Sequence, residues 1–211
     1  VNEIDSDETS MDFGSSEDSI VNEIDSVEQT QVNPVSDLDT QSHIEDDNTS
    51  MKFDLPKNQS SVIKVIGVGG GGSNAVNYMI DQGIRGVDFM ICNTDAQALD
   101  QGQALTKIQL GISLTEGLGA GANPSVGEQS ALESESAIRE ILQKNTKMVF
   151  VTAGMGGGTG TGAAPIIAKI SKDLDILTIG IVTAPFSFEG PKRFTQAQEG
   201  IEKMREYVDS L

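Results

Sequence analysis

The sequence is poor in cysteine and in long apolar runs. Its 211 residues include a single cysteine, Cys92, which excludes a disulfide framework and a cysteine metal site. No window approaches the roughly 18 to 20 unbroken apolar residues of a membrane-spanning helix, and no secretory signal pattern opens the chain. A cytoplasmic protein without direct membrane insertion is the simplest expectation.

Basic residues are scarce as well, with 14 Lys and Arg against 32 Asp and Glu. Residues 1–60 hold sixteen of the acids and two lysines, whereas residues 61–211 hold sixteen acids and twelve bases. Such acidity repels nucleic acid and anionic membrane, so neither is an expected partner. The leading segment has one glycine and scattered hydrophobes, which predicts a disordered acidic extension over 1–60. A solvating tail and a tether for a basic partner both fit.

Residues 61–211 are long enough for one domain. Apolar runs predict strands at 61–67, 87–92, 108–110, 148–151 and 176–182, with helical patterns between them. This alternation implies an α/β fold, a doubly wound and mostly parallel sheet with helices on both faces. One helix is expected to run from Asn123-Pro124 to about Lys144, with the inward positions Val126, Leu132, Ile138, Ile141 and Leu142.

Glycine is abundant in this domain and gathers after the predicted strands. Gly154 to Gly162 reads Gly-Met-Gly-Gly-Gly-Thr-Gly-Thr-Gly, between an apolar strand and a helix whose first turn is expected to contain Pro165. Glycine lets the backbone approach a ligand closely, and a helix start offers unpaired amides, so this loop suits a phosphate. Thr159 and Thr161 are expected to add hydroxyl donors. Gly67 to Asn74 forms a second unit of strand, glycine loop and helix.

The glycine spacing leaves more than one ligand open. Gly67, Gly69 and Gly72 fit the dinucleotide pattern G-x-G-x-x-G, although Asp95 lies slightly late for the ribose-binding acid. No glycine loop is followed by lysine, which excludes a P-loop NTPase. Two amide-rich loops without lysine suggest phosphates held mostly by backbone donors, and a nucleoside di- or triphosphate would fit between them.

Five motifs resemble the tubulin and FtsZ superfamily, and the bacterial FtsZ branch most closely. Gly-Gly-Gly-Thr-Gly-Thr-Gly at 156–162 resembles the family signature. The other four follow in the family's order at 67–76, 93–99, 117–124 and 188–193. The similarity spans about residues 61–211, and 1–60 lie outside it.

The resemblance implies a cytoplasmic GTPase that polymerises head to tail into protofilaments. These would form the ring at mid-cell that organises bacterial division, and other cell-division proteins would tether or regulate the ring. The implied ligands are GTP and GDP, with Mg²⁺ held mainly through the phosphates. A dinucleotide-dependent oxidoreductase and a nucleotide-binding module that never polymerises are the rival hypotheses.

Site residues follow from the same resemblance. Residues near the diphosphate are Gly70, Gly71, Gly72, Ser73 and Asn74. Those that cradle the phosphates are Gly157, Gly158, Thr159 and Gly160, with Gly156 at the bend. The loop that senses the γ-phosphate contains Ala120, Gly121 and Ala122. Asn93 and Asp95 would line the site, Gln97 lies where the family's magnesium environment is found, and Glu189 and Arg193 would face the ribose.

Plainer roles remain open for several of these residues. Glu189 and Arg193, four apart near a helix start, would also form an exposed ion pair. Asn74 fits a helix start, and Asp95 and Gln97 fit a turn.

The chain departs from the family at Leu211. The family continues there into another strand, a central helix that reads the guanine base, and an acidic loop that enters the neighbouring subunit's site. No catalytic residue is therefore expected in this chain, and GTP hydrolysis would require the adjacent subunit's loop. The unfinished sheet favours a cut at this point and predicts an open edge and an uncovered face.

Overall fold

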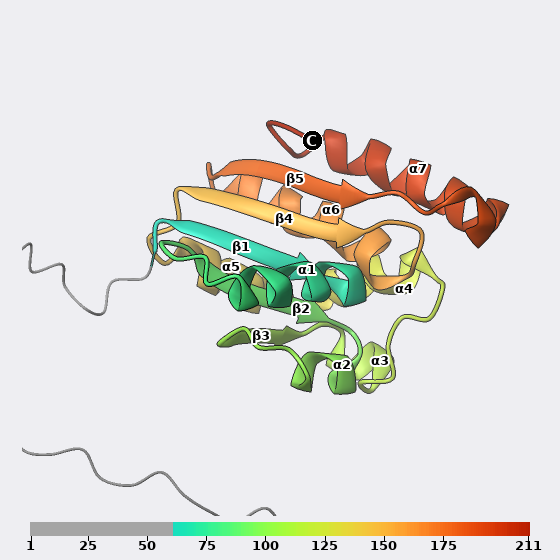
Figure 1. The fold of residues 1–211 in the computed structure, drawn as a ribbon, viewed down its shortest axis with the longest axis horizontal. Helices are drawn as coiled ribbons and strands as arrows, with labels where there is room; N and C mark the ends of the chain where they lie inside the picture. Colours follow the sequence, from blue (N-terminus) through green and yellow to red (C-terminus); the bar gives the residue numbers. More distant parts are fainter. Residues whose placement is uncertain (1–60) are drawn as a thin grey trace, which may run out of the picture. The chain divides into compact units, whose positions relative to one another are not determined.

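The computed structural model describes residues 61–211, so the extension expected at 1–60 lies outside the described residues. Its sheet has five strands, namely β1 (Ile63–Val68), β2 (Asp88–Asn93), β3 (Thr106–Gln109), β4 (Met148–Gly154) and β5 (Leu177–Thr183). Their order is β3-β2-β1-β4-β5, and every pairing between them is parallel. The carboxyl ends therefore share one edge (Figure 1), and the strand order reverses between β1 and β4. This confirms the predicted doubly wound parallel α/β fold.

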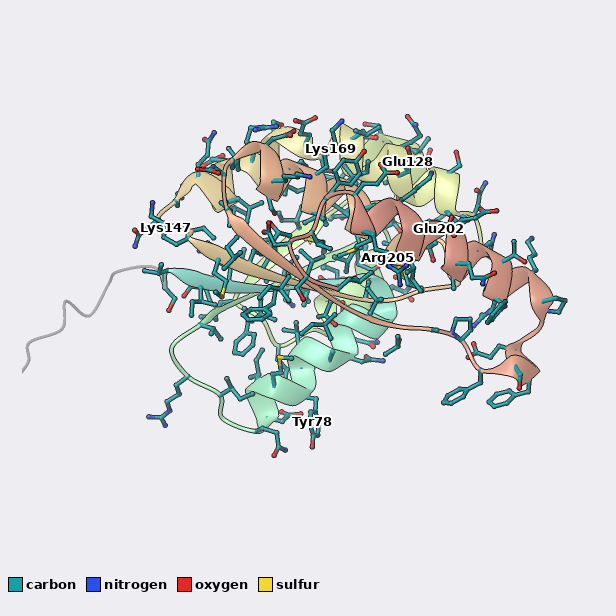
Figure 2. All side chains as sticks on the ribbon, turned by 90° about the horizontal axis from the view of Figure 1, so that it is seen from above. Tyr78, Glu128, Lys147, Lys169, Glu202 and Arg205 are labelled. Carbon is teal, nitrogen blue, oxygen red and sulfur yellow. The ribbon has the colours of Figure 1, made fainter. Side chains whose placement is uncertain are left out.

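Helices cover both faces of the sheet (Figure 1). Their bounds are α1 (Gly69–Asp81), α2 (Ala96–Asp100), α3 (Ile112–Thr115), α4 (Pro124–Glu133), α5 (Glu135–Gln143), α6 (Thr159–Asp173), the 3-10 turn η1 (Ser187–Glu189) and α7 (Pro191–Arg205). Tyr78 of α1 lies on the side of the sheet opposite Glu128 of α4 and Glu202 of α7 (Figure 2). Within residues 61–211, no helix has the length and apolarity to cross a bilayer.

Strand β1 divides the core into two apolar clusters. Because neighbouring strand residues point to opposite faces, Val65 packs in the cluster that contains Val76 of α1. Ile66 and Val68 point the other way, into the larger cluster that contains Ile167 of α6. β1 lies between β2 and β4 and is buried on both sides, which explains why its sequence has no polar side chain after Lys64.

The helix expected between Asn123 and Lys144 is in fact two helices, so that prediction was wrong in its extent. The break is at Ser134, whose hydroxyl accepts a hydrogen bond from the Gly111 N–H at 3.1 Å. Ser134 has φ −96° and ψ 10°, outside the helical range, although its backbone N–H and carbonyl still make helical hydrogen bonds to Ser130 and Ile138. Leu132 is 41% exposed, contrary to its expected inward position, whereas Ile138 and Leu142 are fully buried as predicted.

Helix α6 begins earlier than expected, inside the glycine run at Thr159. Pro165 therefore lies in the helix interior and not in its first turn, which corrects that prediction. The early start depends on glycine: a Cβ at Gly162 would lie 1.9 Å from the Pro124 carbonyl oxygen. α1 likewise begins at Gly69, within its own glycine run.

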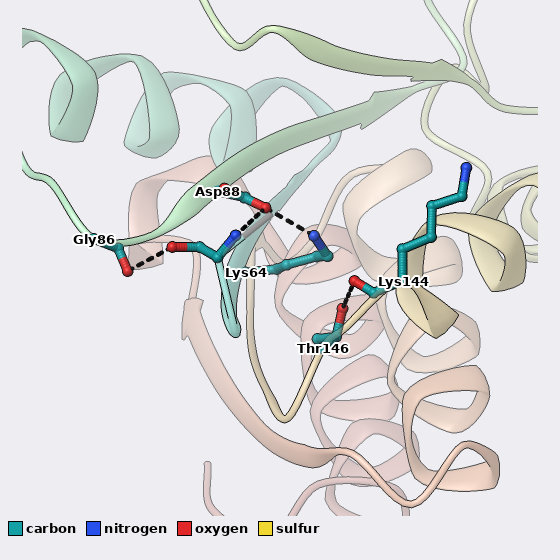
Figure 3. A network of polar contacts seen from close by, with 6 residues as sticks. Lys64, Gly86, Asp88, Lys144 and Thr146 are labelled. Carbon is teal, nitrogen blue, oxygen red and sulfur yellow. Dashed lines mark hydrogen bonds and ion pairs between the residues drawn. The ribbon is translucent and has the colours of Figure 1, made fainter. Parts of the chain in front are cut away.

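Polar contacts stabilise the beginning of β1, at the end of the sheet opposite the carboxyl ends of the strands (Figure 3). Lys64 is buried, and its ammonium lies 2.9 Å from Oδ2 of Asp88, its partner in the β1–β2 register. The same carboxylate accepts the Ser61 N–H, and the Ser61 hydroxyl donates to the Gly86 carbonyl. Burying the ammonium is tolerable because it is paired with a carboxylate.

The last residues of the chain pair with β5, the strand at one edge of the order. Gly180 N–H donates to the Ser210 carbonyl, and Asp209 N–H donates to the Thr178 carbonyl, both at 2.8 Å. On the α1 side of the sheet, β5 is poorly covered: Leu177 and Ile181 are 45% and 48% exposed. This agrees with the expected uncovered face.

Substituting Gly162→Ala is expected to lower the free energy of unfolding by about 2 kcal/mol or more, because the new Cβ would force α4 and α6 apart. Urea unfolding of the 211-residue chain, followed by circular dichroism, measures the change. Gly70→Ala is the matched control, since its Cβ would meet no atom within 4 Å. The control should change stability by less than about 0.5 kcal/mol. Equal stability of the two variants would contradict the packing argument.

Candidate functional site

A cavity of about 780 Å³ opens at the carboxyl edge of the sheet, beside the β1–β4 switch point. Open α/β sheets bind ligands at this place, because diverging connections leave a crevice there. Backbone of small residues forms much of its wall. The lining residues are Gly70, Gly71, Gly121, Gly154, Met155, Gly157, Gly158, Thr159, Gly160, Thr183, Ala184, Pro185, Phe186, Glu189 and Arg193.

Two long helices present their N-termini to this cavity. α1 has 13 residues and α6 has 15; neither has a side-chain cap, and neither has an acidic residue in its first turn. The first amides of a helix have no intrahelical partner, and the helix dipole makes this end positive. The cavity therefore favours an anion such as a phosphate, held by backbone donors.

The two helix starts come this close to each other and to the end of β4 because α1 begins with four glycines and α6 has glycine at Gly160 and Gly162. A Cβ at Gly71 would lie 3.1 Å from the Gly154 nitrogen, and one at Gly160 would lie 2.5 Å from the Gly154 oxygen. Gly69 has φ +68°, and its Cβ would lie 2.9 Å from the Gly160 nitrogen. Side chains at these positions would separate α1 from α6 and disperse the converging amides.

The glycine loop is held in shape by Thr161. This side chain is 3% exposed, and its hydroxyl accepts the Gly156 N–H at 2.8 Å. Gly156 turns the backbone with φ +103°, a conformation that side chains disfavour. The expectation that Thr161 donates to a ligand is therefore wrong, because its hydroxyl is buried within the loop. Thr159 does line the cavity.

The loop expected to sense a γ-phosphate lies over the glycine loop. Gly121 lines the cavity, and a Cβ at Gly158 would lie 2.4 Å from the Gly121 oxygen. Ala120 is buried behind it, and the Ala122 carbonyl accepts from Nε2 of Gln196 on α7 at 3.1 Å. Of these three residues, only Gly121 lines the cavity, whereas Ala120 and Ala122 pack or bond behind the wall.

Among residues 61–211, Glu189 and Arg193 are the only acidic and basic side chains that line this cavity. Their atoms Oε2 and NH1 lie 2.8 Å apart, so the alternative of an ion pair is realised at the cavity wall. The other Glu189 oxygen accepts the Phe186 N–H at 2.9 Å. These hydrogen bonds, from Phe186 first and then Arg193, lower the pKa of Glu189 below its ordinary value of 4.5. The carboxylate is therefore charged at neutral pH and already engaged.

Of the residues expected near the diphosphate, Gly72, Ser73 and Asn74 do not line the cavity. A Cβ at Gly72 would lie 2.3 Å from the Thr152 oxygen, so this glycine serves helix-to-sheet packing. Ser73 is buried, and its hydroxyl oxygen has no hydrogen-bond partner among residues 61–211. Asn74 is exposed on α1. Gly70 and Gly71 are the members that reach the cavity.

The residues predicted to lie at the site in the motif at 93–99 do not line the cavity. Asn93 is buried, and its Oδ1 accepts the Asp95 N–H at 3.3 Å. Asp95 caps α2 by accepting the Ala98 N–H at 3.0 Å, and Gln97 is exposed on the first turn of α2. The structure therefore realises the turn-forming alternative for Asp95.

The candidate site residues did not include the part of the wall at the end of β5. Thr183 to Phe186 line the cavity together with Gly154 and Met155 at the end of β4. Their only signal in the sequence is position, since each segment follows a predicted strand whose carboxyl end shares the cavity's edge.

The described residues offer no metal cage of their own. Within residues 61–211, no three His, Cys, Asp or Glu side chains gather as metal ligands would. A Mg²⁺ ion in this cavity would need oxygen ligands from elsewhere, and the oxygens of a bound phosphate are the chemically suitable source.

Comparison with known proteins gives a consistent result. A family model described as the GTPase domain of the tubulin/FtsZ family matches residues 62–211. The cell division protein FtsZ of Pseudomonas putida is 61% identical over 161 residues, which make up 75% of this chain and 40% of that protein. An empty FtsZ dimer from M. jannaschii is 44% identical with a TM-score of 0.69, over 73% of this chain and 44% of the other. GDP-bound CetZ1 from Haloferax volcanii is 26% identical with a TM-score of 0.63, over 70% and 48%. The chain spans less than half the length of these relatives.

Replacing Arg193→Gln is expected to raise the pKa of Glu189 towards its ordinary value, but not fully, because the Phe186 amide remains. Carboxyl ¹³C shifts followed against pH by NMR measure this directly. Since the folded pKa is lowered, the turn that Glu189 secures keeps this contribution to its stability above the ordinary pKa of 4.5 and loses it as the pH falls through the folded pKa. Lys192→Gln removes one positive charge from the neighbouring residue but leaves the Arg193–Glu189 ion pair intact, so it should leave the Glu189 pKa nearly unchanged. A Glu189 pKa that responds equally to both variants would contradict the pairing.

Proposed function

The chain belongs to the tubulin/FtsZ family, and from this premise we propose that it is the nucleotide-binding part of a GTPase that assembles head to tail into protofilaments. The complete protein would act in bacterial cell division, as the name of its Pseudomonas putida relative indicates for that protein. The chain spans 40% of that relative, so this activity is assigned to the whole protein.

One observation carries the proposal: two uncapped helix N-termini converge on one cavity. Their free amides suit the α- and β-phosphates of a nucleotide, while Glu189 and Arg193 lie on the same wall for hydroxyl groups of a ribose. Volume supports the assignment, since about 780 Å³ lies within the range of small-molecule pockets. Binding would depend mainly on backbone dipoles and not on a lysine.

Magnesium enters the proposal only through the ligand. With no cluster of candidate ligands within residues 61–211, the ion would be coordinated mainly by phosphate oxygens and water. When bound, it would neutralise phosphate charge. Gln97 is the residue that the family resemblance suggests for its surroundings.

Hydrolysis is assigned to a pair of subunits. In the part of the chain that the structure describes, Glu189 is the only carboxylate lining the cavity, and a carboxylate with a lowered pKa that already accepts two hydrogen bonds is a weak general base. Orienting the attacking water supplies much of the rate in phosphoryl transfer. We therefore assign that task to an acidic loop of the adjacent subunit.

Self-assembly is supported by apolar side chains exposed at the cavity's edge of the sheet. Phe186 and Phe188 stack with centroids 5.3 Å apart and are 69% and 83% exposed, and Leu118 is 85% exposed. An exposed apolar pair such as Phe186 and Phe188, one of which lines a ligand cavity, is typical of a protein interface. A second subunit placed there would bury them together with the nucleotide. In the complete protein, we place this polymer in the cytoplasm at the division site, where other division proteins would tether or regulate it.

Titration of the 211-residue chain with a fluorescent GDP analogue tests nucleotide binding. We expect displacement by unlabelled GDP and none by NAD, because the cavity is built for phosphates on converging amides. Competition by ADP as strongly as by GDP would assign base selection to parts of the protein outside this chain.

Displacement by NAD alone would contradict the proposal and favour an oxidoreductase. Absence of any nucleotide binding by a chain with a cooperative thermal transition would also contradict it.

GTP turnover by the dilute chain is expected to be negligible even when nucleotide is bound, because the cavity lacks a carboxylate free to orient water. Phosphate release, measured over a range of chain concentrations, provides the test. Turnover that rises in simple proportion to chain concentration would show a complete site within one copy and overturn the assignment to two subunits.

A further inference from the structure

A buried threonine pair joins β2 to the wall of the cavity. Thr94 follows β2 directly and is fully buried. Its hydroxyl oxygen lies 2.7 Å from the hydroxyl oxygen of Thr159, the first residue of α6. Thr159 lines the cavity, whereas Thr94 lies behind it.

The backbone of Thr94 is itself held rigidly. Its carbonyl accepts hydrogen bonds from the Thr115 hydroxyl and from the Gly119 N–H, both at 3.2 Å. These donors belong to the segment that leads into the loop containing Gly121. Thr94 therefore connects β2, the N-terminus of α6 and the segment that precedes Gly121. Within residues 61–211, its hydroxyl bonds only to the Thr159 hydroxyl.

Burial decides which hydroxyl of the pair donates. Among residues 61–211, the Thr159 oxygen is the one hydrogen-bond partner of the Thr94 hydroxyl. If Thr159 donated to Thr94, the Thr94 proton would remain unsatisfied in the interior, which costs about 1 to 3 kcal/mol. Donation from Thr94 to Thr159 avoids this cost and leaves the Thr159 proton available to an acceptor in the cavity.

We infer that Thr94 is a positioning residue for the phosphate-bearing ligand of this cavity, acting through the hydroxyl of Thr159. By donating to the Thr159 oxygen, Thr94 fixes the orientation of the Thr159 O–H bond. The Thr159 proton then points toward a phosphate oxygen in the cavity. Phosphate oxygens are acceptors only, so the fixed donor adds to the amides of the α6 N-terminus. This inference rests on the proposed nucleotide binding and deepens it.

The test compares the Kd for GDP of the 211-residue chain and its variants by fluorescence competition. Thr94→Val keeps the shape and removes the hydroxyl; it should weaken binding about three- to tenfold, the value of one hydrogen bond. Thr94→Ser restores the hydroxyl and should bind within about twofold of the wild type. Thr146→Val is the matched control, a buried threonine in the network at the other end of the sheet (Figure 3). It should leave the Kd unchanged.

A double-mutant cycle separates positioning from general stability. Thr159→Val should weaken binding as much as Thr94→Val does, and the two changes together should cost no more than Thr159→Val alone, since Thr94 acts only through that hydroxyl. Should Thr94→Val fail to fold by circular dichroism, Thr94→Ser must bind as the wild type does and Thr159→Val must still weaken binding; failure of either would count against the inference.

Additive losses, or a wild-type Kd in Thr94→Val, would overturn the inference and leave the proposed function intact. A folded wild-type chain that binds no GDP would overturn the proposed function itself, and this inference with it.

Discussion

Contact of backbone with backbone at glycine is the constraint on which this structure depends. The carbonyl of Pro124 approaches α6 at Gly162, and the carbonyl of Thr152 approaches α1 at Gly72, at separations that a Cβ would not permit. Dense packing of this kind tolerates little added volume. Because both helices lie so close to the sheet and to one another, their N-termini meet at one edge, between β1 and β4. The cavity is a consequence of that packing.

A site made this way binds anions without a cationic side chain directed at the phosphates. Its donors are amides whose orientation is fixed by α1 and α6, so they need no reorganisation when a ligand arrives. Arg193, the one cation that residues 61–211 place at the wall, is already paired with Glu189. The arrangement is suited to holding a phosphate chain and poorly suited to activating water. That division is the reason that we assign phosphate binding to this chain and propose a neighbouring subunit as the source of the group for hydrolysis.

The predictions that failed share a cause. The break occurs at Ser134, whose hydroxyl bonds to the Gly111 amide 23 residues earlier, and the early part of α6 at Gly162 needs the space beside Pro124. Thr161 matches a ligand donor in the sequence as well as Thr159 does, yet its hydroxyl closes the glycine loop. Thr94 lies inside the motif at 93–99 but was not a candidate site residue, because nothing marks a threonine after a strand until its partner is known. Each outcome was decided by a contact distant along the chain, which local pattern does not contain.

What the sequence determined by itself was the fold class, the strands, the position of the glycine loops and the suitability of their edge for phosphate. These follow from local periodicity and from the conformational freedom of glycine, both of which are properties of short segments. Only the tertiary structure decided which residues form the wall: it placed Gly72 and Ser73 beneath it, used Asp95 to cap α2, and added the segment after β5. A cavity wall is assembled from several segments at once, so its membership depends on packing distances that no single segment specifies.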